Sequence, residues 1–155
     1  MARFFGRREI EFERPLPPAR VTLDAIATVH NGVKKPRPNG WEDVESRVEF
    51  RAVHRARLEG LDAFSHVIVV FYLDLAEDAL EKPERMKLAS GNTYGILATR
   101  SQLRPNHLGV SAVRLERLEG LSLFVVGLDA IDGTPVLDVK PYLPEYDAFP
   151  AARTP

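Results

Sequence analysis

The feature that most constrains the fold of this chain is a repeated alternation of apolar and polar residues with a period of two. Between residues 21 and 30 every odd position is apolar, and most even positions are polar or charged. The same pattern returns at Val48, Phe50 and Ala52. Successive side chains of a β-strand point to opposite faces of the sheet, so this period is typical of strands buried on one face.

A second kind of strand signal lies at residues 66–73, HVIVVFYL, which are apolar on both faces and rich in β-branched residues. This run predicts a central strand that is covered on both sides. Further strands are predicted at residues 94–99, 110–117, 121–128 and 135–139. Glu119 and Gly120 predict a tight hairpin between the second and third of these.

Helical periodicity is weak along the whole chain. The best candidate, AEDALEKPERMK at residues 76–87, contains Pro83, which lacks a backbone donor and clashes with the preceding turn. We therefore expect a long connection there with one helical turn. Several short strands separated by turns predict an all-β fold, either a barrel or a sandwich. Since no G-x-G-x-x-G motif follows the first strand and no Walker-type loop is present, the fold is not a Rossmann domain.

Composition limits the architecture and the compartment. With 155 residues, 45% of them hydrophobic, the chain can close one core, and we expect a single folded domain. It has no cysteine, which excludes disulfides, thiolate nucleophiles and cysteine-ligated metals. The amino-terminal segment lacks the hydrophobic core of a signal peptide, and Val67 to Leu73 is far shorter than the roughly 20 residues of a membrane-spanning helix. We therefore expect a cytoplasmic protein without a membrane span.

The net charge is −1, so no overall electrostatic field indicates nucleic acid as a partner. The charge is unevenly distributed, because residues 1–40 hold eight Lys or Arg against four Asp or Glu. This basic region could contact phosphates. For residues 1–20, a solvated and partly disordered extension is the alternative interpretation.

The segment ATRSQLRPNHLG, residues 98–109, concentrates polar side chains between two apolar runs. Pro105 favours extended geometry at Arg104, and Gly109 permits a backbone path that a side chain would forbid. Guanidinium, amide and imidazole groups held in a rigid loop can bind a carboxylate or a ribose. An ordinary turn with solvated arginines is the alternative.

Two further polar patches stand beside apolar strands. In LDAIDGTPVLDVKPYLP, residues 128–144, two carboxylates come before a turn, and Asp138 and Lys140 share one face of the next strand. A bare Asp-Gly turn is the alternative there. Ser65 and His66 begin the central strand, where ligand groups often gather, although a histidine there is more often structural.

These three patches, in this order, resemble the TrmO family, also called the TsaA-like or YaeB-like family. Its members carry GLxxFSH before an apolar strand, then GxFATRSPxRPNPIGLS, then LDxxDGTPVLDIKPYLP. The counterparts here are Gly60 to His66, Gly95 to Ser111 and Leu128 to Pro144. The resemblance spans roughly residues 21–147, which predicts a barrel domain there, with residues 1–20 as a charged extension and 148–155 as a tail.

The resemblance implies a single-domain antiparallel β-barrel with few short helical turns that binds S-adenosylmethionine as a homodimer without a metal. It implies methyl transfer to the exocyclic nitrogen of threonylcarbamoyladenosine, beside the anticodon of a tRNA substrate. Longer members carry an additional carboxy-terminal domain. A small molecule or another RNA as acceptor, and a non-catalytic cofactor-binding module, are the alternatives. A hydrolase using His66 with Asp129 or Asp132 lacks a credible nucleophile.

The resemblance also assigns residues. Arg100 is the expected cofactor contact, with Arg104 and Asn106 organising its loop, and the turn from Ala130 to Thr134 offers backbone groups to the adenine or ribose. The expected cofactor-binding set is His66, Val67, Arg100, Arg104, Asn106, Leu108, Gly109, Val110, Ala130, Ile131, Asp132, Gly133 and Thr134. The expected catalytic set is Asp138 as base, Lys140, and Tyr142 as a stacking surface. A structural ion pair between Asp138 and Lys140 is an equally good interpretation.

Two positions depart from the family pattern. Gln102 and His107 each stand where family members have proline. We expect both changes to loosen the loop slightly, and His107 adds a titratable group that could touch substrate.

Overall fold

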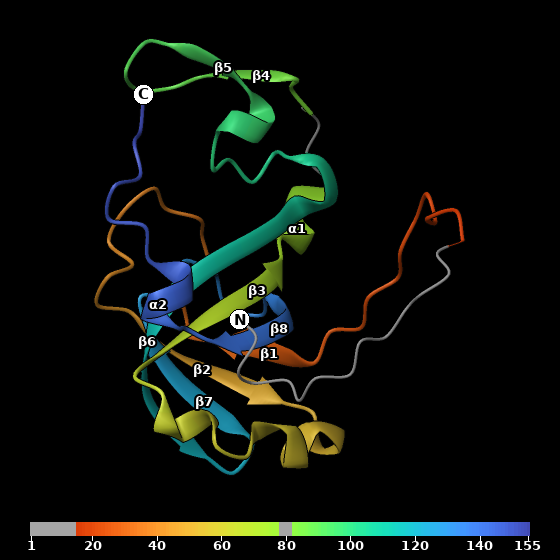
Figure 1. Ribbon diagram of the computed structural model, residues 1–155, viewed down its shortest axis with the longest axis vertical. Coiled ribbons are helices and arrows are strands. Elements are labelled where there is room, and N and C mark those ends of the chain that lie inside the picture. The colour runs from red at the N-terminus through yellow and green to blue at the C-terminus, as the bar shows by residue number, and fades with distance from the viewer. Residues whose placement is uncertain (1–14, 78–81) are drawn as a thin grey trace. The chain divides into compact units, whose positions relative to one another are not determined.

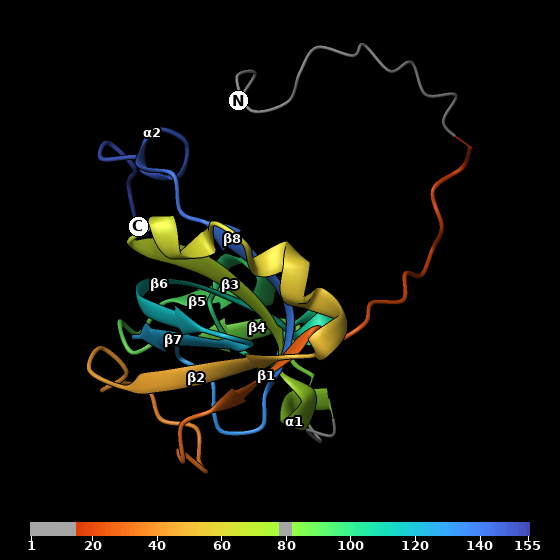
Figure 2. The same cartoon turned by 90° about the horizontal axis from the view of Figure 1, so that it is seen from below.

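The computed structural model describes residues 15–77 and 82–155. Within these residues six antiparallel strands close a barrel, and two more form a separate hairpin (Figures 1 and 2). The barrel strands are β1 Ala27–His30, β2 Glu45–Phe50, β3 His66–Tyr72, β6 Leu108–Glu119, β7 Ser122–Val126 and β8 Pro135–Pro141. The hairpin strands are β4 Arg85–Lys87 and β5 Thr93–Gly95. The predicted all-β antiparallel barrel is therefore confirmed.

The helical elements are short. The α-helices are α1 Asp74–Glu77 and α2 Pro144–Asp147. The 3₁₀ helices are Ala52–Leu58, Leu61–Ala63, Ile96–Ala98 and Pro105–His107. These bounds agree with the weak helical periodicity of the sequence and with the single helical turn expected near residues 76–87, of which 78–81 lie outside the described residues.

The core of the barrel consists of the inward positions of the strands. In β2 the burial alternates strictly, with Ser46, Val48 and Phe50 inside. In β3 the inward residues are Val67, Val69 and Phe71, while Ile68 and Val70 face outward and are only partly buried. The strand expected at residues 66–73 is present as His66–Tyr72, but it is fully covered on its inner face only, and its outer face is partly exposed. In a closed barrel no strand is central, and β3 pairs with β6 and β8.

The order of the strands around the barrel is β1-β2-β7-β6-β3-β8, and every neighbouring pair is antiparallel. The connections 31–44, 73–107 and 127–134 therefore all leave the barrel at one end, which we call the loop end. The connections 51–65 and 120–121 lie at the opposite end. The hairpin of β4 and β5 extends beyond the loop end (Figure 1).

Two of the predicted strands differ from the structure. The strand expected at residues 21–30 begins only at Ala27, and the exposed Val21 and Leu23 precede it. The strand expected at 94–99 ends at Gly95, where the chain turns into a 3₁₀ helix. Both segments have the right local pattern but lack a neighbouring strand along their full length. The Glu119–Gly120 hairpin is confirmed, because Glu119 pairs with Ser122.

Of the described residues, those from 25 to 142 form one compact unit, and residues 15–24 with 143–155 form another. In the second unit the described helix α2 is capped by the Asp147 carboxylate, which accepts a hydrogen bond from the Leu143 amide at 2.7 Å. The predicted limits of the extension, the domain and the tail stay predictions, and residues 1–14 lie outside the described residues. Over the described part of the chain, no helix has the length and apolarity needed to cross a membrane.

Candidate ligand-binding cavity at the loop end

A cavity of about 1160 Å³ opens at the loop end of the barrel. All three loop-end connections contribute to its wall. The polar and aromatic lining residues include Arg37 and Trp41 from the first, Asp74, Thr99, Arg100 and Arg104 from the second, and Asp129 and Thr134 from the third. The two polar segments predicted to hold a ligand therefore meet at one cavity.

The loop of residues 98–109 is held by its own hydrogen bonds. The Arg104 guanidinium donates to the Thr99 carbonyl at 2.9 Å, and Arg104 has the extended backbone that the following proline predicts. The Arg100 guanidinium donates to the Val110 carbonyl at 2.7 Å. Neither arginine is paired with a carboxylate within the described residues, so both guanidinium groups can attract an anion at the cavity wall.

His107 ties this loop together instead of loosening it. Its side chain is buried, and its Nδ1–H donates to the Gln102 carbonyl at 3.1 Å, because a carbonyl can only accept. Asn106 and His107 both have left-handed backbone, with φ of 64° and 48°. A proline at 107 could supply neither the ring donor nor the backbone N–H that bonds Arg104 at 3.2 Å. The two departures from the family pattern therefore contact each other.

Gly109 is required by packing and not by its backbone conformation. A Cβ at this position would lie 2.2 Å from the ring of Phe71, which pairs with Gly109 across β3 and β6. The absence of a side chain lets a large buried ring close the barrel beneath the cavity.

Asp129 is the carboxylate of the third connection that lines the cavity. Ser111 donates its hydroxyl hydrogen to Asp129 Oδ1 from the neighbouring strand β6. Among the described residues, the second oxygen of this exposed carboxylate has no hydrogen-bond or ion-pair partner. Asp129 can therefore accept a hydrogen bond or a proton from a bound molecule.

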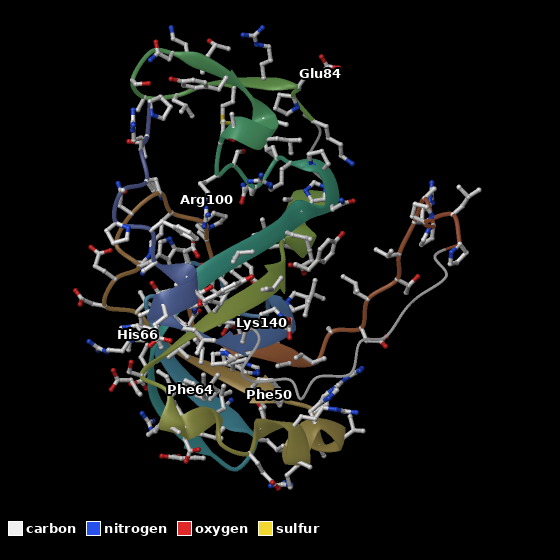
Figure 3. All side chains as sticks on the ribbon, in the orientation of Figure 1. Phe50, Phe64, His66, Glu84, Arg100 and Lys140 are labelled. Atoms are coloured by element: carbon white, nitrogen blue, oxygen red, sulfur yellow. The ribbon has the colours of Figure 1, made fainter. Side chains whose placement is uncertain are left out.

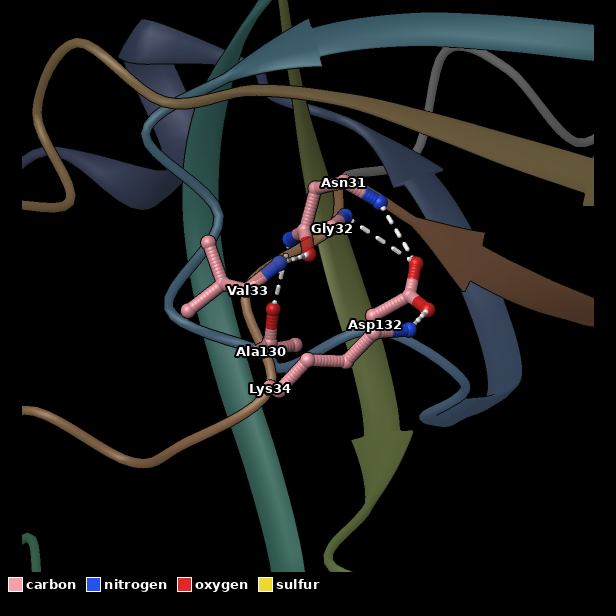
Figure 4. Close-up of polar contacts among 6 residues, drawn as sticks. All are labelled: Asn31, Gly32, Val33, Lys34, Ala130 and Asp132. Carbon is pink, nitrogen blue, oxygen red and sulfur yellow. Dashed lines mark hydrogen bonds and ion pairs between the residues drawn. The ribbon is translucent and has the colours of Figure 1, made fainter.

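Asp132 has a structural role in the same connection (Figure 4). Its carboxylate accepts hydrogen bonds from the Lys34 ammonium and from the backbone amides of Asn31, at 2.9 Å, and Gly32, at 3.1 Å. The Lys34 hydrogen bond first, and then the two amides, hold the pKa of Asp132 well below its usual range. This network joins the first and third connections of the loop end.

Asn31 completes the network from the end of β1. Its side-chain amide donates to the Ala130 carbonyl at 2.8 Å and to the fully buried Ser46 hydroxyl at 3.0 Å. Its side-chain oxygen accepts from the Val33 amide at 3.0 Å. Residues 31–34 and 130–132 are thus fixed against each other beside the cavity.

Asp138, Lys140 and Tyr142 do not line the cavity. Asp138 and Lys140 pair with Val70 and Ile68 on the outer face of the barrel and form an ion pair of 2.6 Å. Tyr142 contacts the ring of His66, with 6.2 Å between the centroids. Figure 3 shows His66 and Lys140 beside the body of the barrel, well away from Arg100. The structural ion pair considered for Asp138 and Lys140 is therefore present.

The expected cofactor-binding residues divide into groups by position. Those at the larger cavity are Arg100, Arg104, Leu108, Gly109, Val110, Ala130, Ile131 and Thr134. Asn106 and Arg104 line a smaller cavity of about 740 Å³ on the other side of the loop. Asp132 and Gly133 lie in the turn behind the wall, and His66 lies on the outer face. Val67 is fully buried in the core, so its side chain has no access to a ligand.

The sequence interpretation missed Arg37, Trp41 and Asp74 at the cavity. The signal that could have found the first two is the single tryptophan of the chain within a basic, proline-containing segment, KKPRPNGW. Within the described residues no group of three or more His, Asp or Glu could hold a metal ion.

Comparison with known proteins gives these positions a family context. The family described as the tRNA-methyltransferase O N-terminal domain matches residues 27–148. A protein of Pyrococcus abyssi, named a probable S-adenosyl-L-methionine-binding protein, is 32% identical over 137 residues, which are 84% of this chain and 72% of that protein. A tRNA (adenine(37)-N6)-methyltransferase of Eikenella corrodens is 45% identical over 97 residues, which are 58% of this chain and 54% of that enzyme.

A solved structure is similar as well. The crystal structure of TrmO superposes with a TM-score of 0.69 at 34% identity, covering 87% of this chain and 63% of that one. The chain thus spans little more than half of the Eikenella corrodens enzyme, and 42% of a relative from Pseudomonas aeruginosa.

Proposed function

Because the chain belongs to the tRNA-methyltransferase O family, we propose that it methylates the exocyclic nitrogen of threonylcarbamoyladenosine in tRNA, with S-adenosylmethionine as donor. The observation that carries this proposal is the meeting of residues 98–109 and 129–134 at one cavity. Relatives whose names include S-adenosylmethionine binding and tRNA adenine methylation support it.

The lining of the cavity fits the proposed cofactor. Arg100 and Arg104 offer guanidinium groups to a carboxylate, and the exposed Asp129 offers a carboxylate to a cationic group. Leu73 and Ile131 offer apolar contact to a purine. When bound, S-adenosylmethionine supplies a methyl group activated by its positively charged sulfur.

The acceptor nitrogen must lose its proton as it gains a methyl group, because its lone pair is delocalised between a purine and a carbamoyl group. We assign the proton-accepting role to Asp129, which lines the cavity and has one oxygen that no described residue contacts through a hydrogen bond or an ion pair. Ser111 orients this carboxylate. Asp138, the base expected from the sequence, is already paired with Lys140 on the outer face. The remaining contribution of the site is alignment of the reacting groups, which can supply on the order of 7 kcal/mol or more.

The experiment that tests the proposal is methylation of defined tRNA by the purified chain. tRNA that reads ANN codons, with the threonylcarbamoyl group present, should gain one methyl group, and the same tRNA without that group should gain none. Calorimetry with S-adenosylmethionine separates the alternatives, since binding without transfer to any acceptor would indicate a regulatory module. Absence of binding would contradict both.

We further propose that the chain works as a cytoplasmic homodimer. The outer faces of β3 and β6 lie side by side (Figure 1) and carry an apolar stripe that includes Ile68, Val70, Val110 and Ala112. Val110 is 44% exposed, although it lies in a strand that is paired with β3 at this position. A second copy covering this stripe would place its surface beside the cavity that Val110 also lines. Ala112→Arg should give a monomer by sedimentation, and an unchanged sedimentation coefficient would contradict this interface.

A further inference from the structure

The first connection of the loop end brings an aromatic ring and an arginine to the cavity. Trp41 lines the cavity, and the Arg37 guanidinium lies over its ring at 4.8 Å from the centroid. The indole N–H donates to the Arg37 carbonyl at 3.0 Å. Since this is the ring's only hydrogen-bonding group, Trp41 can offer an incoming molecule a stacking surface but no polar recognition.

The cations of this segment differ in whether they have an ion-pair partner. Lys34 is paired with Asp132 and belongs to the structural network. Lys35 and Arg37 are exposed, and within residues 15–77 and 82–155 neither has an ion-pair partner. Pro36 and Pro38 flank Arg37, and each proline ring fixes the φ angle of its own residue. Trp41 and Arg37 thus lie together at the wall of the cavity, and Lys35 is a second exposed cation two residues before Arg37.

We propose that Trp41 is the stacking platform for an unpaired nucleobase of the RNA acceptor, with Lys35 and Arg37 contacting its flanking phosphates. This inference rests on the proposed function and names how the acceptor is held. Single-stranded nucleic acid is recognised by stacking of bases on aromatic rings or guanidinium planes, combined with cations that follow the phosphates. Anticodon loops present such bases.

The adenine of the cofactor is another nucleobase that could stack on Trp41. The charges favour the RNA, because S-adenosylmethionine has no phosphate and its sulfonium is positive. Lys35 and Arg37 would then have no anion to neutralise except one carboxylate, for which Arg100 and Arg104 stand at the same cavity. Arg37 over the ring, with Lys35 two residues before it in the sequence, matches a polyanionic strand.

Trp41 is the single tryptophan of the chain, so its fluorescence reports on this position alone. The test titrates the whole chain with an anticodon stem-loop, and separately with S-adenosylhomocysteine, while fluorescence anisotropy of a labelled stem-loop measures RNA binding independently. We expect the stem-loop to quench Trp41 with the same Kd that anisotropy gives. S-adenosylhomocysteine alone should leave the emission unchanged.

Variants give a second readout that does not depend on activity. Trp41→Ala should raise the Kd of the stem-loop roughly 5- to 100-fold, the range that loss of one stacked base produces, and Trp41→Phe should restore most of the affinity. Lys35→Ala and Arg37→Ala should each lower the slope of log Kd against log salt by about one. Arg55→Ala removes an exposed cation from the connection at the opposite end of the barrel and serves as the matched control. The Kd of S-adenosylhomocysteine should be the same in all of these variants.

The outcomes separate this inference from the function on which it rests. If the stem-loop binds by anisotropy but leaves Trp41 emission and the Trp41→Ala affinity unchanged, the inference is wrong and the function stands. If S-adenosylhomocysteine quenches Trp41 and RNA has no effect, the ring contacts the cofactor, and the inference is wrong. If no stem-loop binds at all, the proposed tRNA substrate fails together with the inference.

Discussion

Two regions of this barrel carry the same kinds of side chain but differ in how those side chains are partnered. The cavity at the loop end has Asp129, Arg100 and Trp41. The outer face of β3 and β8 has Asp138 and Lys140, with Tyr142 following β8. A carboxylate, a cation and an aromatic ring are present in each.

The partners decide which region can act on a ligand. On the outer face, Asp138 and Lys140 satisfy each other at 2.6 Å. In the cavity, Asp129 is held by the neutral hydroxyl of Ser111, and Arg100 by the neutral carbonyl of Val110. A charged group that is held by a neutral group still attracts a ligand of opposite charge. In an ion pair, the partner's opposite charge offsets most of that attraction. The comparison therefore favours the cavity as the site of chemistry.

The largest expected effect comes from exchanging the two carboxylates for amides. Asp129→Asn should lower kcat for tRNA methylation by about 10²- to 10⁴-fold, the usual contribution of a general base. Asp138→Asn should change kcat by less than about threefold, because its charge serves a surface ion pair. Single-turnover kinetics with saturating cofactor measure both. A larger loss of kcat in Asp138→Asn than in Asp129→Asn would indicate that the base lies on the outer face.

The next effect tests the two cations. Arg100→Ala should weaken S-adenosylmethionine binding by about tenfold to a hundredfold, since a hydrogen bond to a charged group contributes about 1.5–3 kcal/mol. Lys140→Ala should leave the affinity within about twofold. Calorimetric titration measures both values. Equal losses in the two variants would mean that the cofactor also contacts the outer face.

A smaller effect concerns Gly109, which lines the cavity and pairs with Phe71 of β3. Gly109→Ala should destabilise the fold by about 1–3 kcal/mol, because the new methyl group overlaps the buried Phe71 ring. Gly95→Ala is the matched control, since a Cβ there meets nothing within 4 Å. Urea unfolding measures both changes. A fully stable Gly109→Ala variant would show that the Phe71 ring can move away from β6.

The smallest effect is the pH dependence of the Asp132 network. The pKa of Asp132 is lower in the folded protein than its ordinary value, so the stabilisation it brings is present at neutral pH and is lost as the pH falls through the folded pKa. Wild type should therefore melt above Asp132→Asn at neutral pH, and the difference should shrink in strong acid. Lys34→Ala should weaken this dependence, because the Lys34 hydrogen bond is its largest cause, with the Asn31 and Gly32 amides still in place. A difference in Tm that is constant with pH would contradict the role of this ion pair.

Much of the fold and part of the site could be predicted from the sequence because the relevant patterns are local. The alternation in β2 and the hairpin at Glu119 and Gly120 need only neighbouring residues. Asp138 and Lys140 are two residues apart on one strand, and an ion pair between them was one of the two interpretations of the sequence. The structure has this ion pair. The expected strand at 94–99 had the same kind of pattern, but it ends at Gly95 because a strand needs a partner along its length.

The sequence by itself determined that this chain is an antiparallel all-β protein, since side-chain periodicity and turn residues are properties of short segments. Only the tertiary structure decided which face of each strand is inside, so that Val67 enters the core and Ile68 the outer stripe. It also decided that residues 36–41 and residues 99–110 both contribute to the wall of one cavity. The physical reason is that closing the barrel brings distant segments together, and this closure depends on all strand pairings at once.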